Sequence, residues 1–200
     1  MPVLPKAVFD ERVALAAVRK RLPLRIDDVM PSESLTVCVL SFRFAATGGK
    51  AGAMRLTVEV TLRANRTEVW AAVSTVGGIN REIAPFVRMT DPTGGAPFDA
   101  EPWRLGAPVS WQLLLGVIPI DRHRIELVAL PDGRGFRESS STWWYRVWWH
   151  ERTLLDDPAG CIVRDSVEIE PRLGVLAPIV AWPVRRMFRQ RYRSLQRRFG

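Results

Sequence analysis

The side chains best suited to proton transfer are the only two histidines of the chain, His123 and His150. An imidazole changes its protonation state near neutral pH, which makes histidine the commonest general acid or base. Glu138, which lies between them in the sequence, is a third candidate. Glu151 follows His150 directly, but adjacent strand residues face opposite sides of a sheet, so these two cannot act as a pair. For both histidines, a hydrogen-bonded structural role in the core is the more common alternative.

Other reaction classes find little support in the sequence. Three consecutive serines occupy positions 139–141, but no G-x-S-x-G motif surrounds them. Neither G-x-G-x-x-G nor G-x-x-x-x-G-K-[ST] occurs, so we expect no dinucleotide and no nucleoside triphosphate as cofactor. Cys38 and Cys161 are the only cysteines, too few for a disulfide scaffold or a four-cysteine metal site. The sequence therefore predicts no metal and no cofactor, and it favours a protein that is not an enzyme.

Tryptophan is unusually frequent, with eight residues in the chain. Four of them, Trp143, Trp144, Trp148 and Trp149, lie within seven positions of one expected strand. Strand alternation sends Trp143 and Trp149 to one face and Trp144 and Trp148 to the other. Indoles combine a large apolar area with one hydrogen-bond donor, so at least one of the four is expected to line a ligand cavity. Core packing is the alternative explanation.

The basic charge of the chain, +8, is confined to its C-terminal part. Residues 171–200 hold eight arginines and no acidic residue, whereas the rest of the chain is neutral overall. A solvated helix face is the ordinary explanation. The alternative is contact with an anionic membrane surface through Arg185, Arg186, Arg189, Arg193 and Arg197. Nucleic-acid binding is not expected, because no recognition motif accompanies the charge.

The first 53 residues form an N-terminal extension. We expect a helix at residues 10–22 and an apolar strand at residues 35–44. Residues 45–53 are small and predict a flexible linker. The apolar strand needs a partner, so we expect it to dock on the domain formed by residues 54–200, either on the tryptophan-rich strand or at a free sheet edge.

Beyond residue 53 the apolar pattern predicts one strand, two short helices, a run of strands and a long final helix. Alternating apolar residues mark the strand at 56–62, and Asn65 or Thr67 caps the first helix. The pair Gly77-Gly78 separates it from a second helix at 80–84. Further strands are expected at 86–89, 109–118, 122–130, 135–140, 143–155 and 161–170, with turns at 119–121, 131–133 and 156–160.

The final helix, at residues 174–199, carries one apolar stripe. Consecutive strands with short turns indicate an antiparallel sheet, and a single amphipathic helix buries its stripe against one face of that sheet. The predicted class is therefore α+β, with a curved antiparallel sheet of about six to seven strands wrapped on the long C-terminal helix, and two short helices after the first strand.

Over residues 55–199 the chain resembles the START/Bet v 1-like superfamily, the helix-grip proteins also called SRPBCC or polyketide cyclase-like. The segment VTLRANRTEVWAAVST, which contains Trp70, is similar to the first strand and helix of that family. The motifs W-x-H at residues 148–150 and D-x-V at 165–167 resemble its last two strands. The motif F-x-x-R-x-x-x-L at residues 188–195 resembles the end of its final helix.

The resemblance implies a cavity between the sheet and the long helix, in which a hydrophobic small molecule such as a lipid, a polyketide or an aromatic metabolite is bound or carried. A cavity of roughly 300–1,000 Å³ is expected. The expected ligand-binding residues are Trp70, Trp143, Trp144, Trp148, Trp149, Val180, Val184 and Met187. A polyketide cyclase/dehydrase-like enzyme using His123, His150 or Glu138 is the first alternative. A membrane-surface or protein-interaction module using the arginine-rich helix is the second.

Two further features bear on location. No apolar run reaches the roughly 18–20 residues needed to cross a bilayer, and the N-terminus lacks the pattern of a secretory signal. Arginine replaces lysine almost throughout, which is typical of a GC-rich bacterial genome. We therefore expect a bacterial, cytoplasmic protein, with peripheral membrane attachment as the alternative.

Overall fold

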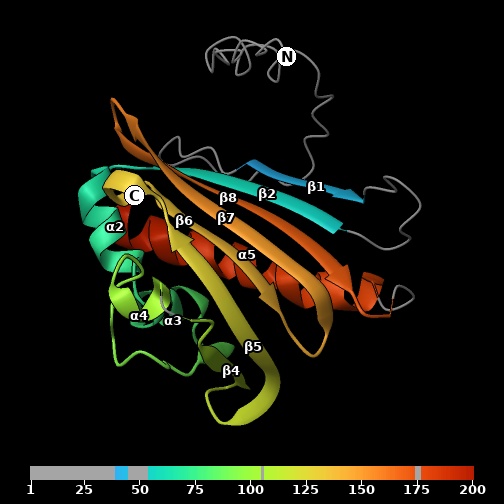
Figure 1. Ribbon diagram of the computed structural model, residues 1–200. Coiled ribbons are helices and arrows are strands. Elements are labelled where there is room, and N and C mark those ends of the chain that lie inside the picture. Colours follow the sequence, from blue (N-terminus) through green and yellow to red (C-terminus); the bar gives the residue numbers. More distant parts are fainter. Residues whose placement is uncertain (1–38, 45–53, 105, 174–176) are drawn as a thin grey trace, which may run out of the picture. The chain divides into compact units, whose positions relative to one another are not determined.

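A computed structural model describes residues 39–44, 54–104, 106–173 and 177–200 (Figure 1). The chain divides into two compact units at residue 35, and all described residues belong to the second unit. The helix predicted at residues 10–22 and the linker predicted at residues 45–53 lie outside the described residues.

Eight strands form a single sheet in which every neighbouring pair is antiparallel. They are β1 (Val39–Phe44), β2 (Met54–Leu62), β3 (Val87–Met89), β4 (Val109–Leu114), β5 (Ile118–Ala129), β6 (Gly135–Ser141), β7 (Tyr145–Asp157) and β8 (Gly160–Pro171). Their order across the sheet is β1-β2-β8-β7-β6-β5-β4-β3. The predicted antiparallel sheet is confirmed, with seven strands after residue 53 and β1 as an eighth.

Four α-helices accompany the sheet in the described part of the chain: α2 (Arg66–Val73), α3 (Val76–Ile83), α4 (Glu101–Arg104) and α5 (Ala177–Phe199). A short 3-10 helix, η1 (Pro131–Gly133), joins β5 to β6. Asn65 caps α2 as predicted, because its side chain accepts a hydrogen bond from the Glu68 amide at 2.9 Å. The break before α3 comes earlier than expected, since Thr75 rather than Gly77-Gly78 starts the new helix by accepting from the Gly78 amide.

The long helix α5 lies along the concave face of the sheet, and α2, α3 and α4 gather near its C-terminal end (Figure 1). Its apolar stripe, including Val184, Phe188 and Leu195, is buried in the core with side chains of β2, β7 and β8. The Tyr192 hydroxyl donates to the carbonyl of Val58 in β2 at 2.9 Å. The Arg63 amide donates to the carbonyl of Phe199 at 2.8 Å, which ties the end of α5 to the end of β2.

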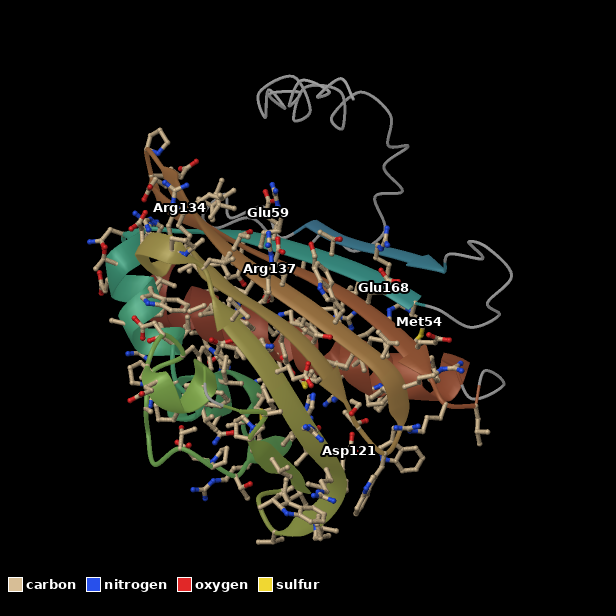
Figure 2. The ribbon with its side chains drawn as sticks, viewed as in Figure 1. Met54, Glu59, Asp121, Arg134, Arg137 and Glu168 are labelled. Carbon is tan, nitrogen blue, oxygen red and sulfur yellow. The ribbon has the colours of Figure 1, made fainter. Side chains whose placement is uncertain are left out.

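Alternation along the strands separates a buried inner face from a charged outer face. In β2, for example, Leu56 and Val58 are buried, whereas Glu59 is half-buried on the other side. Figure 2 shows Glu59, Arg137 and Glu168 on the outer side of the strands that carry them. Ion pairs join neighbouring strands on this face, such as Arg164 with Glu59 at 2.7 Å.

Strand β1 pairs with the free edge of β2, from Val39 opposite Glu59 to Phe44 opposite Met54. The prediction that the apolar strand of the extension docks on a sheet edge is confirmed for residues 39–44. Residues 35–38 of that predicted strand lie outside the described residues.

The turn between β4 and β5 differs from the prediction. It was expected at residues 119–121, but the chain reverses at Leu115 and Gly116, whose φ angles are 52° and 78°. Positive φ at both central positions is the geometry of a two-residue hairpin turn. Pro119 is tolerated inside β5 because the pairing of β5 with β6 begins only at Arg124, so the missing amide of Pro119 leaves no bond to β6 unmade.

Candidate functional site

A small cavity lies between α3, the segment that carries α4, the strands from β3 to β7, and α5. Its free volume is about 60 Å³, enough for a few water molecules. The expected volume of several hundred Å³ is therefore wrong for this structure. The reason is the segment before β4, from which Phe98 and Trp103 enter the space: Phe98 stacks edge-to-face on Trp103 at 5.2 Å and on Phe136 at 5.3 Å.

The three proton-transfer candidates meet on the wall of this cavity. The Nε2 atom of His123 lies 3.0 Å from one oxygen of Glu138, and the Nδ1 atom of His150 lies 3.6 Å from the other. All three side chains are buried. Burial alone would raise the pKa of Glu138, but the two histidines hold it well below its usual range. Glu138 is therefore a carboxylate in an otherwise largely apolar space.

Two polar neighbours orient this group. Ser140 donates a hydrogen bond of 2.7 Å to Glu138. The side-chain nitrogen of Gln112 lies 2.9 Å from Nδ1 of His123. If the Gln112 amide donates there, the proton of a neutral His123 sits on Nε2 and faces Glu138.

A network of buried ion pairs begins on the far side of His150, whose Nε2 lies 2.8 Å from Asp165. Arg152 binds both oxygens of Asp165, at 2.9 and 2.8 Å, and also donates to Glu82 in α3 at 2.8 Å. Arg191 of α5 donates to the other oxygen of Glu82 at 2.9 Å. Burial would raise the pKa of Asp165, but Arg152 lowers it well below the ordinary value. The network thus locks β7, β8, α3 and α5 around His150.

Three buried side-chain nitrogens on the cavity wall have no hydrogen-bond partner among the described residues. One is Nε2 of His123, which still lies 3.0 Å from a Glu138 oxygen. The other two are the indole nitrogen Nε1 of Trp148 and the guanidinium nitrogen Nη2 of Arg191. Both side chains are more than nine-tenths buried, with exposed fractions of 6% and 4%. Buried donors are nearly always paired in folded proteins, so this pair marks the polar part of the cavity.

The structure brings part of the expected ligand-binding set to the cavity. Trp148 and Met187 line it, and Val184 is buried in the adjoining core. Trp70 is half-buried and packs on Gly133, where a Cβ atom would lie 2.8 Å from the indole. Val180 belongs to α5, but its side chain lies outside the described residues.

The other three tryptophans lie elsewhere. Trp143 and Trp144 are 56% and 51% exposed, because they belong to the turn before β7, which begins only at Tyr145. Trp149 lines a shallow groove on the outer face of the sheet, with Arg55 and Glu168 among its neighbours. Of the four tryptophans at positions 143–149, only Trp148, on the same strand face as His150, lines the cavity.

Sequence reasoning missed Gln112, Glu82, Arg152 and Arg191. For Arg191 a signal was available: it follows Phe188 by three positions and precedes Leu195 by four, which places it on the apolar stripe and not on the arginine-rich face. Arg152 pairs with Asp165, the first residue of the D-x-V motif on the neighbouring strand, at 2.8 Å.

The described residues hold no group of three or more His, Cys, Asp or Glu side chains arranged to bind a metal ion. None of their helices is long and apolar enough to cross a membrane.

The sequence model of the family described as "Domain of unknown function (DUF8410)" matches residues 60–199. No curated protein matches the chain significantly. Among solved structures, protein CV1439 from Chromobacterium violaceum is similar, with 16% identity and a TM-score of 0.52 over 72% of this chain and 94% of that chain. A START superfamily protein from Mycobacterium smegmatis has 12% identity and a TM-score of 0.51 over 74% and 96%. These likenesses confirm the predicted START/Bet v 1-like helix-grip fold.

Proposed function

The chain belongs to the family described as "Domain of unknown function (DUF8410)", and from that premise we propose that it binds a small, largely apolar molecule carrying a carbonyl group in the cavity between its sheet and α5. One observation carries the proposal: Trp148 and Arg191, whose side chains each hold a buried donor without a partner, line a cavity whose other walls are mostly apolar. A ligand oxygen that accepts from either donor would remove the cost of a buried, unpaired N–H group.

The charge of the site favours a ligand with a neutral hydrogen-bond acceptor over a ligand with a carboxylate group. Three buried carboxylates, on Glu82, Glu138 and Asp165, stand against two buried guanidinium groups, on Arg152 and Arg191. A carboxylate on the ligand would add a fourth buried negative charge to a site with two buried guanidinium groups, so it would be repelled. A ketone or aldehyde oxygen accepts the same hydrogen bonds without adding charge.

Binding a molecule larger than a few waters requires the cavity to enlarge. The segment with Phe98 and Trp103 is the part to move, because it is joined to the domain by apolar packing and by the Phe98 amide, which donates to the Ser74 carbonyl at 2.8 Å. The bond of the Trp103 indole to the Ala96 carbonyl, at 3.1 Å, lies within the segment. The opposite walls belong to the sheet and to α5, which are tied by the buried ion-pair network. We therefore propose that the ligand displaces the aromatic side chains of this segment.

Competition with a fluorescent apolar probe tests the proposal. Phenylnaphthylamine should become brighter on binding the full chain, and acetylnaphthalene should displace it more effectively than ethylnaphthalene, which has nearly the same size but no carbonyl. Equal displacement by the two compounds would show that the donors of Trp148 and Arg191 do not bind a carbonyl oxygen of the ligand. Absence of probe binding and of any ligand on native mass spectrometry would overturn the binding function itself.

A second candidate function is proton transfer at a carbon next to the ligand carbonyl, as in a cyclase or dehydrase. Glu138 favours it, because an ionised carboxylate on an apolar cavity wall is a typical general base. His150 lies between two carboxylates, with Nδ1 at 3.6 Å from Glu138 and Nε2 at 2.8 Å from Asp165, so its ring is placed to exchange a proton with Glu138. In this reaction Glu138 would take the proton from carbon while the Trp148 indole donates to the enolate oxygen.

Hydrogen–deuterium exchange separates this enzyme from a binding protein. In deuterium oxide, the methyl protons of bound acetylnaphthalene should exchange faster with the wild-type chain than with Glu138→Gln. A loss of about a hundredfold or more is expected for removal of a general base. Exchange no faster than in buffer would leave binding as the function.

A further inference from the structure

Exposed apolar side chains gather at one end of the described domain, at the tip of the β4–β5 hairpin and the turn between β6 and β7. We call them the apolar rim: Leu114, Leu115, Val117, Ile118, Trp143 and Trp144. Their exposed fractions range from 38% for Leu114 to 73% for Val117. In Figure 1 the hairpin and the turn lie at the same end of the sheet, and Figure 2 labels Asp121 of β5 between them.

Specific contacts hold the two parts of the rim together. Trp143 stacks edge-to-face on Trp111 of β4 at 5.3 Å, and its amide donates to Asp121 at 2.9 Å. The Trp144 indole donates to the carbonyl of Ile120 at 2.9 Å. The rim is therefore a fixed surface of the fold, not a set of unrelated side chains.

Neither folding nor turn chemistry accounts for a leucine at position 115. Its φ of 52° lies in the left-handed region, where asparagine, aspartate or glycine is usual in a two-residue turn. Leucine is disfavoured there by contact between its Cβ and the backbone. Its side chain is 63% exposed, so it gains little from core packing. An exposed leucine in this backbone conformation is therefore suited to contact with an apolar environment outside the domain.

The charges around the rim are positive. Three exposed arginines adjoin the rim: Arg88 beside Gly116, Arg122 opposite Trp111, and Arg172, whose amide donates to the Trp144 carbonyl. Farther along, the Arg186 guanidinium lies 4.7 Å from the Phe86 ring centre. The segments 86–89, 111–122, 142–149 and 172–189 contain a single acidic residue, Asp121, and it is buried.

We propose that the apolar rim docks the domain on an anionic lipid bilayer. The hairpin tip is convex and ends in aliphatic side chains that can enter the acyl region, whereas its flanking tryptophans suit the interface between lipid and water. The surrounding arginines supply the attraction to anionic headgroups. The sequence offered the arginine-rich face of α5 only as an alternative membrane contact, whereas this surface is centred on the β4–β5 hairpin and the β6–β7 turn. It does not depend on the cavity having a ligand.

The test compares the full chain with two matched variants in vesicle sedimentation. Leu115→Asn with Val117→Thr removes two rim side chains, and asparagine suits the turn, so the hairpin is expected to stay folded. Val128→Thr changes a valine that lies in β5 but outside the rim and is equally exposed, 67% against 73% for Val117. The wild-type chain and Val128→Thr should bind vesicles with about 30% phosphatidylserine at low salt. The double variant should bind roughly tenfold more weakly.

Lipid-borne quenchers supply an independent measure. Brominated acyl chains should quench the fluorescence of the wild-type chain, and quenching should fall in Trp143→Phe with Trp144→Phe. The proposal is overturned if the wild-type chain does not sediment with anionic vesicles, or if the double hairpin variant binds as well as Val128→Thr. If the wild-type chain does not bind vesicles and is dimeric in sedimentation equilibrium, the apolar rim contacts a second copy of the chain and the proposal is overturned.

Discussion

Arg152 and Asp165 lie directly opposite each other on β7 and β8, and the guanidinium binds both carboxylate oxygens with neither side chain exposed to solvent. The residue before Asp165 in β8, Arg164, points to the outer face and pairs with Glu59, with both side chains about one-third exposed. Two ion pairs on adjacent positions of one strand thus lie in very different surroundings.

This difference predicts unequal losses of stability. Asp165→Asn leaves the Arg152 charge buried without its main partner and should lower the free energy of unfolding by about 3–5 kcal/mol. Glu59→Gln breaks the outer pair and should cost about 0–1 kcal/mol. Urea denaturation followed by circular dichroism measures both. Similar losses in the two variants would contradict the burial of the network.

Stability should fall in acid. The pKa values of Glu138 and Asp165 are lower in the folded chain than their ordinary values of 4.5 and 3.8. The unfolded chain therefore takes up protons first as pH decreases, so the stability that both carboxylates supply is full above those ordinary values and is lost progressively below them. Urea midpoints between pH 7 and pH 3 should decrease mainly below about pH 4.5.

Two glutamate variants test this pH dependence, one at Glu138 and one, as the control, at Glu168. Glu138→Gln should flatten the decrease in acid, because one of the two titrating groups is gone. Glu168→Gln, on the exposed outer face, should leave the profile unchanged. Identical profiles for wild type and Glu138→Gln would show that Glu138 does not titrate abnormally.

Removing Trp103 should enlarge the cavity. This side chain is 2% exposed and stacks on Phe98 beside the cavity. Trp103→Ala should cost about 3–5 kcal/mol of stability and increase the binding of phenylnaphthylamine. Trp103→Leu gives the same test with a smaller loss of packing. Trp182→Ala, at a 66% exposed position, is the control and should change neither quantity. Unchanged probe binding in both Trp103 variants would show that this segment does not limit the cavity.

Strand β1 should protect the edge of β2. A variant that begins at Met54 lacks β1 and leaves the backbone groups of β2 that face it without partners. Hydrogen exchange of those β2 amides that donate to β1 should be faster in this variant, and its unfolding midpoint should be lower. Equal exchange and equal stability would mean that residues 39–44 contribute nothing to the sheet.

The architecture could be predicted because each element carries its own pattern. Alternating residues in β2 and the stripe of α5 encode which faces are buried, and short turns require antiparallel neighbours. The β4–β5 turn was misplaced because Pro119 is a stronger turn signal than Leu115-Gly116, although only the latter pair adopts positive φ. Because the turn was misplaced, the exposed positions of Leu115 and Val117 were not predicted.

The site was predicted less well, since it depends on relations between strands. His123, Glu138 and His150 come from β5, β6 and β7. The register places His150 opposite Glu138, but the β5 residue opposite Glu138 is Leu127, so only the three-dimensional structure shows that His123 also reaches this carboxylate. The volume of the cavity is set by Phe98, in a segment without regular structure whose path no periodicity encodes. Trp143 and Trp144 were assigned to a strand that begins after them.

The central claim is that Trp148 donates to a carbonyl oxygen inside the cavity. Trp148→Phe keeps an aromatic ring and removes only the indole N–H, and Trp144→Phe makes the same change at an exposed position. The affinity for acetylnaphthalene, measured by displacement of phenylnaphthylamine, should fall about threefold to tenfold in Trp148→Phe. It should stay unchanged in Trp144→Phe, as should the affinity of both variants for ethylnaphthalene. Equal affinities of the wild-type chain and Trp148→Phe for acetylnaphthalene would contradict the claim.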